Sequence, residues 1–533
     1  MKTSRMRKRF AISFTFLSGL VVLGCIGVQA LQAPAPSVLD QVSVEQLIQG
    51  PQGPPYVPQG PIAIVGGLLI DATDAPPRHD QTVLIDGERI VEVGPMEDVR
   101  IPGGARVIDA RGMTIMPGLI DSNQHFVLNP LFSTPDVSFS YEDFKSRWEH
   151  NWAQMEYVAF AYLMQGITGF RQTPGPADLQ LEVKRRIDKG EIPGPRIYLG
   201  GSLWMSKAHW DRHLKQNTQV DPKAIDFIKH QFEYNVIEDV NNLDPNGWGQ
   251  EGPDFNFWKL YMWEEPFDGE NDFTDEELRH IIKRAHELGK IIDVHAGGHN
   301  NGLRRMLAFD VDTLEHPFYG NELIEWDVIE GYVKKGVIID TLLEVMVQKI
   351  ELAADPHRFD ETLYSMSLYG RGTRPAPFEH RLLMQYRDKL LYNKRHPDKP
   401  GLRVYPPDST ETGRSYNDQM KAMEISKENM RRFIKAGAKF WMGTDTGAFM
   451  TMRQEDPYAR EMAYMVEMGM TPVQAIQAAT RNGAEGLGLL DELGTIEEGK
   501  LADVIVVAGN PLQDMKGAMK RVYAVIKGGV RYK

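Results

Sequence analysis

The sequence predicts an α/β protein made of a (β/α)8 TIM barrel and a small composite β-sandwich domain built from both termini. Short β-branched runs separated by Gly-containing turns occupy residues 62–116 and again residues 491–533. Between them, residues 117–490 alternate helical segments with short apolar strands, and polar residues follow several of those strands. A doubly wound sheet would instead need a glycine-rich ligand loop, and none is visible in the sequence.

Residues 1–30 have the pattern of an export signal. Basic residues precede an apolar run that starts at Phe10, and the tripeptide VQA offers small residues for cleavage. We therefore expect an exported protein, periplasmic or extracellular. Two alternatives remain open. The apolar run approaches the length of an uncleaved membrane anchor, and Cys25 lies in VLGC, which resembles a bacterial lipoprotein cleavage site.

Charge and cysteine content narrow the classes of function. The net charge of −13 becomes more negative when residues 1–30 are removed, because this segment carries basic but no acidic residues. An acidic surface repels nucleic acid, so we expect no nucleic-acid partner, and no membrane contact in the mature form unless Cys25 is lipidated. Cys25 is the single cysteine. A chain cleaved after Ala30 would thus hold any metal with nitrogen and oxygen atoms.

The two ends of the folded body are expected to form one β domain. Residues 31–61 are rich in Pro and Gly and are expected to be a linker. Residues 62–116 predict a small antiparallel sheet, and residues 491–533 supply a matching set of strands. Chain ends often lie close together, which favours one composite domain over the alternative of two unrelated β caps.

The middle of the chain carries the barrel pattern and one long insertion. Thr274 precedes a helix that is acidic at its start and basic at its end, the pattern of a capped helix. Residues 352–420 are too many for a barrel loop and too polar for a core. We expect this insertion to form a lid or an oligomer contact over the barrel mouth.

Polar side chains stand at the carboxyl ends of the expected barrel strands. A single histidine in an apolar strand is usually a satisfied core residue, but polar groups at the same end of several strands converge on one point in a barrel. Asn123 and His125 are two residues apart and therefore face the same side of their strand. The full set is Asn123, His125, Arg171, Lys259, His295, His316 and Asp445.

Lys259 lies in FWKLYMW, as apolar a setting as this chain has. A buried ammonium without a partner is costly, so this lysine must be paired, deprotonated or chemically modified. A neutral lysine amine can bind carbon dioxide to form a carbamate, which can bridge two metal ions. An ion pair with a nearby acid such as Asp445 is the open alternative.

Three further residues are candidates for substrate binding. Arg171 could pair with a substrate carboxylate, or equally with an acid below the barrel rim. His209 lies beside Trp210 on an expected loop, and Tyr261 follows Lys259 in the aromatic run. The alternatives are an ordinary surface histidine and an aromatic residue that only packs.

Seven segments together resemble the amidohydrolase superfamily in their order and spacing. The resemblance covers nearly everything from Ile62 to Lys533, and the C-terminal part is similar to the branch with imidazolonepropionase-like and Xaa-Pro dipeptidase-like members. It implies a metal-bearing barrel that hydrolyses an amide-type C–N bond of a dipeptide, N-acyl amino acid, urea or carbamate. The segments are VIDARGMTIMPGLIDSNQHF, GITGFRQT, DFNFWKLYM, DVHAGG, DTLEHPF, GTDTG and TIEEGKLADVIVV.

The resemblance also implies a set of metal ligands. Asn123 departs from it, because the family usually has histidine there and an amide oxygen is a poorer zinc ligand than imidazole. The Asn-x-His variant resembles a branch with phenylurea and thiocarbamate hydrolases. The matching positions are His125 in the strand-one pair, Lys259 as the carboxylated lysine, His295 and His316 after strands five and six, and Asp445 after strand eight.

The implied cofactors are one or two divalent metal ions, zinc first with cobalt, manganese or iron as alternatives, and carbon dioxide as the carbamate of Lys259. Metal-activated water would attack the carbonyl of a small-molecule substrate, and Asp445 would carry its proton to the leaving nitrogen. The alternative is a metal-depleted barrel that acts as a binding or scaffold protein, with Asn123 as its first lost ligand. A homo-oligomer is a further expectation.

Overall fold

The computed structural model of the protein describes most of the chain beyond the expected signal and linker. The expected signal segment 1–30, most of the linker 31–61 and most of the insertion 352–420 lie outside the described residues, as does His209. Tyr261 is described as part of a strand but without its side chain. The described ranges are 56–58, 60–125, 158–172, 177–206, 255–262, 273–344, 387–402, 415–446 and 456–533, with single residues and pairs between them.

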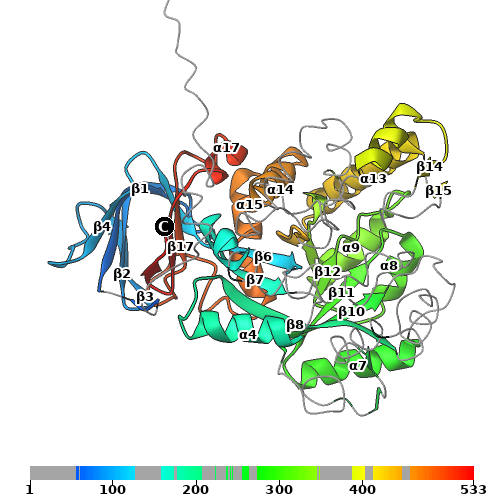
Figure 1. Ribbon diagram of the computed structural model, residues 1–533, viewed down its shortest axis with the longest axis horizontal. Helices are drawn as coiled ribbons and strands as arrows, with labels where there is room; N and C mark the ends of the chain where they lie inside the picture. Colours follow the sequence, from blue (N-terminus) through cyan, green and yellow to red (C-terminus); the bar gives the residue numbers. More distant parts are fainter. Residues whose placement is uncertain are drawn as a thin grey trace, which may run out of the picture. The chain divides into compact units, whose positions relative to one another are not determined.

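Strands from both ends of the chain pair in one eight-stranded sheet (Figure 1). Its path runs β19-β18-β17-β5-β1-β2-β3, and β4 pairs with β1. Where the two ends meet, β5 and β17 are antiparallel, with Met116 opposite Ile505. A composite β domain is therefore confirmed. The strands are β1 (Ile62–Leu69), β2 (Arg78–Asp86), β3 (Arg89–Pro95), β4 (Arg106–Asp109), β5 (Thr114–Pro117), β17 (Val504–Val507), β18 (Val522–Lys527) and β19 (Val530–Arg531).

The pairing within this sheet differs from the fully antiparallel arrangement expected for residues 62–116. β1, β2 and β3 are antiparallel neighbours, but β4 and β5 both pair with β1 in parallel. The chain after β3 returns to the start of β1 before β4 begins, so both later strands run in the direction of β1. The sheet is continuous, and one hydrophobic cluster of its buried side chains includes Ile64, Val83, Ile115, Val504 and Ile526.

Eight parallel strands form a nearly closed barrel, as the sequence predicts. Their order follows the chain, from β6 through β16, and short β9 (Val236–Ile237) pairs with β8 at the side. The ring closes next to β16, where Ser122 donates to the Met442 carbonyl at 2.9 Å and Gln124 forms a parallel bridge with Thr446. The barrel strands are β6 (Leu119–Gln124), β7 (Ile167–Gln172), β8 (Arg196–Ser206), β10 (Phe257–Met262), β11 (Ile291–Ala296), β12 (Thr313–Glu315), β13 (Ile338–Asp340) and β16 (Lys439–Trp441).

Helices alternate with the barrel strands and cover them (Figure 1). In α7, Thr274 forms a capping box with Glu277, as its sequence predicts, and the apolar side chains Leu278, Ile281 and Ile282 are buried. Among the described residues, no helix is both long and apolar enough to span a membrane. The helices are α4 (Ala177–Asp188), α7 (Asp275–Glu287), α8 (Asn300–Met306), α9 (Trp326–Lys335), α13 (Tyr416–Lys435), α14 (Pro457–Glu467), α15 (Pro472–Ala478), α16 (Arg481–Gly486) and α17 (Met515–Met519).

Candidate functional site

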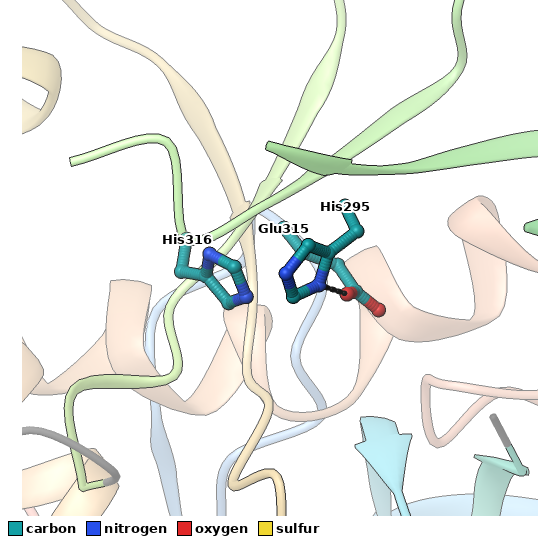
Figure 2. Close-up of side chains that lie close together, drawn as sticks. All are labelled: His295, Glu315 and His316. Atoms are coloured by element: carbon teal, nitrogen blue, oxygen red, sulfur yellow. Dashed lines mark hydrogen bonds and ion pairs between the residues drawn. The ribbon is translucent and has the colours of Figure 1, made fainter. Parts of the chain in front are cut away.

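Two histidines and a glutamate come together at the carboxyl ends of β11 and β12 (Figure 2). One donor atom from each of His295, Glu315 and His316 lies within 4.8 Å of the others, close enough to hold a single metal ion. The His295 Nδ1 lies 3.4 Å from a Glu315 oxygen, and the two imidazole rings meet edge-on with centroids 4.4 Å apart. Two imidazoles and one carboxylate are a common ligand set for zinc and iron.

The backbone and a second hydrogen bond fix the orientation of His316. Its φ of 33° is unusual for a residue with a side chain and turns the chain sharply after β12. Its Nδ1 lies 3.0 Å from the Ala296 carbonyl, which can only accept, so Nδ1 carries the proton and Nε2 keeps its lone pair. Burial lowers the pKa of His316 to about 3, which keeps the ring neutral, the form that binds metals.

Lys259 forms a buried ion pair with Glu315. The ammonium nitrogen lies 2.6 Å from the carboxylate, and Glu315 is fully buried. Burial acts to raise the pKa of Glu315, but the charge of Lys259 and the hydrogen bond from His295 outweigh it and hold this pKa well below its usual value. The partner is thus Glu315 and not Asp445, which was the example expected from the sequence.

Asn123, His125 and Asp445 form the opposite side of the site. His125 Nε2 lies 2.7 Å from a carboxylate oxygen of Asp445, and the Asp445 N–H donates to the Asn123 carbonyl at 2.9 Å. Asp445 has a φ of 54°, so the chain turns here as it does at His316. Its charge affects the pKa values of both His295 and His316, which places it near that pair. The side chains from β6 and the end of β16 therefore face the same region of the barrel mouth as those from β11 and β12.

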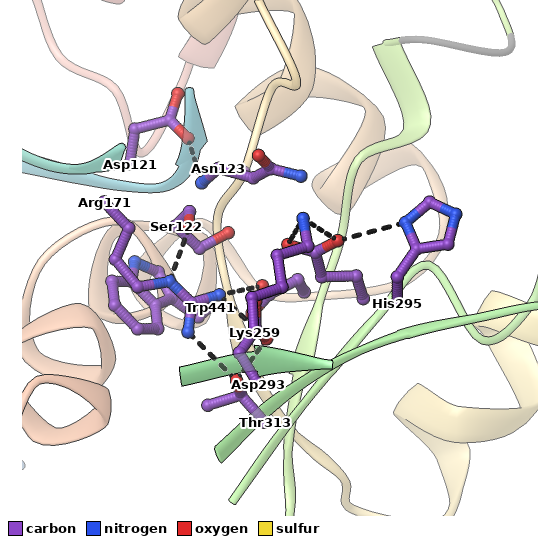
Figure 3. Close-up of polar contacts among 12 residues, drawn as sticks. Asp121, Ser122, Asn123, Arg171, Lys259, Asp293, His295, Thr313 and Trp441 are labelled. Atoms are coloured by element: carbon purple, nitrogen blue, oxygen red, sulfur yellow. Dashed lines mark hydrogen bonds and ion pairs between the residues drawn. The ribbon is translucent and has the colours of Figure 1, made fainter. Parts of the chain in front are cut away.

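The carboxylate of Asp121 connects β6 to the segment that follows β16; its contact with Asn123 is visible in Figure 3. It accepts from the N–H of Asn123 at 2.9 Å and from the hydroxyl of Thr444 at 2.7 Å, and it also bonds to the side-chain amide of Gln124. Gln124 donates in turn to the hydroxyl of Tyr458 on α14 at 3.0 Å. Burial raises the pKa of Asp121 to about 7.

Arg171 lies beneath the site and is fully buried (Figure 3). Its guanidinium donates to the Ser122 carbonyl at 2.6 Å, to the Thr313 hydroxyl at 2.9 Å and to Asp340 at 2.5 Å, and it lies 3.1 Å from Asp293. The faces of Phe257 and Trp441 also pack on it. Arg171 was expected to pair either with a substrate carboxylate or with an acid below the barrel rim. In the structure it pairs with acids below the rim, and its guanidinium has no exposed surface that a substrate could contact.

Sequence reasoning missed four acidic or aromatic residues. Asp293 lies two positions before His295 on the same face of β11, so strand alternation could have found it. Glu315 could have been found as the acidic residue that ends β12, directly before His316. Asp340 ends β13, one of the strands for which no residue was singled out. Tyr319 carried no such signal, because it lies beyond the end of β12, where strand alternation no longer predicts the direction of a side chain.

The residues present fit a divalent metal ion. The Ala296 bond leaves the Nε2 lone pair of His316 free to bind, a buried carboxylate lies beside both imidazoles, and every donor is nitrogen or oxygen. His125 and Asp445 pair with each other rather than joining that cluster. The side chain of Asn123 is buried, with 1% of its surface exposed.

Comparison with known proteins finds relatives along most of the chain. The model of the amidohydrolase family matches residues 114–531. The ochratoxinase of Aspergillus niger is 24% identical over 505 residues, covering 88% of this chain and 86% of the relative. The imidazolonepropionase of Geobacillus kaustophilus is 35% identical over 471 residues, covering 84% of this chain and 89% of the relative. The crystal structure of phenylurea hydrolase B superposes with a TM-score of 0.64 at 21% identity, covering 89% and 97% of the two chains.

Proposed function

Because the chain belongs to the amidohydrolase family and is a hydrolase that acts on C–N bonds, we propose that it is a metal-dependent enzyme that hydrolyses an amide-type bond of a small molecule. The cluster of His295, Glu315 and His316 carries the proposal. A scaffold protein has no need for two imidazoles and a carboxylate oriented around one point at the mouth of a barrel.

The proposed ligands of the metal come from both sides of the site. When bound, one or two divalent ions, zinc first, would supply Lewis-acid activation of water and of the substrate carbonyl. Asn123 would be a weak ligand, or would orient the substrate with its amide. Cobalt, manganese and iron suit the same nitrogen and oxygen donors. The proposed ligands are His125, Lys259 as its carbamate, His295, His316 and Asp445, with Glu315 beside Lys259.

The carbamate on Lys259 and the metal should depend on each other. A carbamate would replace the positive charge beside Glu315 with a negative one, and two buried anions in contact are unstable without a cation. Without metal, the ion pair between the ammonium of Lys259 and Glu315 satisfies both groups. Metal loading would therefore favour the carbamate, and metal removal would favour the ion pair.

Asp445 would carry the proton during hydrolysis. Its carboxylate bonds to His125 and lies near the two other histidines, where it can take the proton of the attacking water and return it to the leaving nitrogen. Without metal, the pair with His125 holds Asp445 in place. The strained backbone of Asp445, with its positive φ, supports a functional position.

The substrate class is proposed from the family branch and the relatives. An Xaa-Pro dipeptide, an N-acyl amino acid, an aryl urea and a carbamate all offer a carbonyl next to a leaving nitrogen. The names ochratoxinase and phenylurea hydrolase B suggest that aromatic amides and ureas belong in this group. A hydrolysis screen over these four classes with zinc-loaded protein tests the proposal. Hydrolysis that is lost with a chelator and restored by zinc supports it, and zinc-loaded protein that cleaves none of the four contradicts it.

Export of the protein is also proposed, from the basic start and apolar run of residues 1–30. N-terminal sequencing of the protein from its native host tests this proposal. A first residue near position 31 supports cleavage, a lipid on Cys25 supports the lipoprotein alternative, and an intact Met1 contradicts processing.

A further inference from the structure

Tyr319 lies directly against the candidate metal centre. Its ring stacks on that of His316, with centroids 4.8 Å apart and planes within 3° of parallel. Its N–H donates to the His316 carbonyl at 3.0 Å, and its own carbonyl accepts from Gly298 at 2.6 Å. A Cβ at position 298 would lie 2.6 Å from that carbonyl oxygen, so only glycine allows this contact. Ring and backbone together hold Tyr319 in one position.

The hydroxyl of Tyr319 is buried and lacks a hydrogen-bond partner among the residues that the structure describes. Other buried phenols of this chain are bonded: Tyr332 donates to the Leu303 carbonyl at 2.7 Å, and Tyr458 accepts from Gln124 at 3.0 Å. A buried hydroxyl without a partner destabilises the folded protein. Such a donor beside a functional site is suited to a ligand that bonds to it.

The groups around this hydroxyl are acidic. Asp445, Glu344 and Glu461 all act on the phenol through their charges. Two of them have other partners: Glu461 accepts from the N–H groups of Leu343 and Glu344 at 3.1 and 2.7 Å, and Glu344 pairs with Arg460 at 2.8 Å. Asp445 belongs to the site itself. The phenol therefore lies within the field of these carboxylates, with its own proton available to an acceptor.

We propose that Tyr319 is a substrate-binding residue whose hydroxyl donates a hydrogen bond to the carbonyl oxygen of the scissile bond. This inference rests on the proposed hydrolytic function. Negative charge develops on that oxygen as water attacks, and a donor already held in place stabilises it. Amides, ureas and carbamates share this oxygen, so Tyr319 should matter for every substrate of the class, whatever the leaving group.

The test compares Tyr319→Phe with Tyr332→Phe, a matched loss of a buried phenolic hydroxyl away from the site. Three quantities are measured: zinc content, the Kd of acetohydroxamate, which offers a carbonyl oxygen to a metal site, and kcat/KM for a substrate from the screen. We expect Tyr319→Phe to keep its zinc, to bind acetohydroxamate about 2- to 10-fold more weakly, and to lose roughly 100-fold in kcat/KM. Tyr332→Phe should lose stability and leave all three unchanged.

The outcomes separate this inference from the proposed function. A Tyr319→Phe protein that binds acetohydroxamate and turns over substrate like the wild type overturns the donor role and leaves only ring stacking on His316. Loss of zinc from Tyr319→Phe also overturns it, because the hydroxyl would then serve the metal centre. A wild-type protein that binds neither zinc nor acetohydroxamate refutes the proposed function itself, and this inference with it.

Discussion

Asp121 and Thr444 join the first and last strands of the barrel. Thr444 donates its backbone N–H to the Asp121 carboxylate at 3.2 Å and its hydroxyl at 2.7 Å. Both residues neighbour the candidate site: Asn123 donates to the same carboxylate, and Asp445 follows Thr444 in the chain. One buried carboxylate thus keeps the two segments in register where the barrel closes.

Asp121→Asn should therefore weaken both stability and metal retention. The amide replaces one acceptor oxygen with a donor. Either the side-chain amide of Gln124 or the backbone N–H groups of Asn123 and Thr444 then lose their acceptor, which should cost about 1–3 kcal/mol in the free energy of unfolding. Denaturant unfolding and zinc content after dialysis measure the two effects. Thr444→Val removes the same contact, so the double variant should lose less than the sum of the single losses. Strictly additive losses would show that the two residues act separately.

Arg171 should be essential for folding. Arg171→Met would leave the buried carboxylates of Asp293 and Asp340 without their cation, a loss of about 3–5 kcal/mol. Arg171→Lys keeps the positive charge but not the several N–H donors of the guanidinium. It should therefore recover only part of the stability that Arg171→Met loses. Arg304→Met, which removes an exposed ion pair with Asp327, is the control and should cost about 0–1 kcal/mol. Equal unfolding free energies for the two methionine variants would contradict this prediction.

The carbamate can be detected directly on Lys259. Zinc-loaded protein supplied with carbon-13 bicarbonate should give a carbamate signal in NMR spectra, and Lys259→Met should lack this signal, retain less zinc and be inactive, because an anionic ligand is lost. Lys527→Met is the matched control, since Lys527 is also buried and instead donates to the Gly194 carbonyl at 2.6 Å. It should keep the signal. A Lys259→Met protein that retains zinc and activity would make Glu315 the anionic ligand.

Asn123→His tests how many metal ions the site holds. If Asn123 is a weak ligand, an imidazole there should raise the metal content towards two ions per chain, since imidazole binds zinc more strongly than an amide. If the amide orients the substrate beside one ion, the content should stay near one and activity should fall. Metal analysis and rates measured on the same preparation distinguish these results.

Glu461 should make stability depend on pH. Burial raises its pKa from about 4.5 to about 8, so the folded protein binds a proton between these values that the unfolded chain releases. The contribution of Glu461 to the free energy of unfolding is then complete below about pH 4.5. It is lost as the pH rises to 8, and the unfolding free energy falls by on the order of 1 kcal/mol per pH unit. Glu461→Gln cannot release this proton, so its unfolding free energy should fall less between pH 5 and 8. Parallel curves for the two proteins would contradict the prediction.

The helix cap at Thr274 and the barrel strands could be predicted from the sequence because their signals are local. A capping box lies within four residues, and apolar strands followed by polar residues recur along the chain. His125, His295 and His316 could be singled out for the same reason, since His295 is the last residue but one of β11 and the other two directly follow strands. The parallel pairing of β4 and β5 with β1 could not, because it depends on how the chain crosses back after β3.

The sequence by itself determined which residue types stand at the mouth of the barrel, because strand alternation and parallel order place them there. Only the tertiary structure decided their partners. Lys259 pairs with Glu315, 56 positions away, and Arg171 pairs with acids on β11 and β13 instead of facing a substrate. Such pairs depend on distances between strands that are far apart in the chain. In a buried barrel each charge must find a partner wherever the fold brings one within reach.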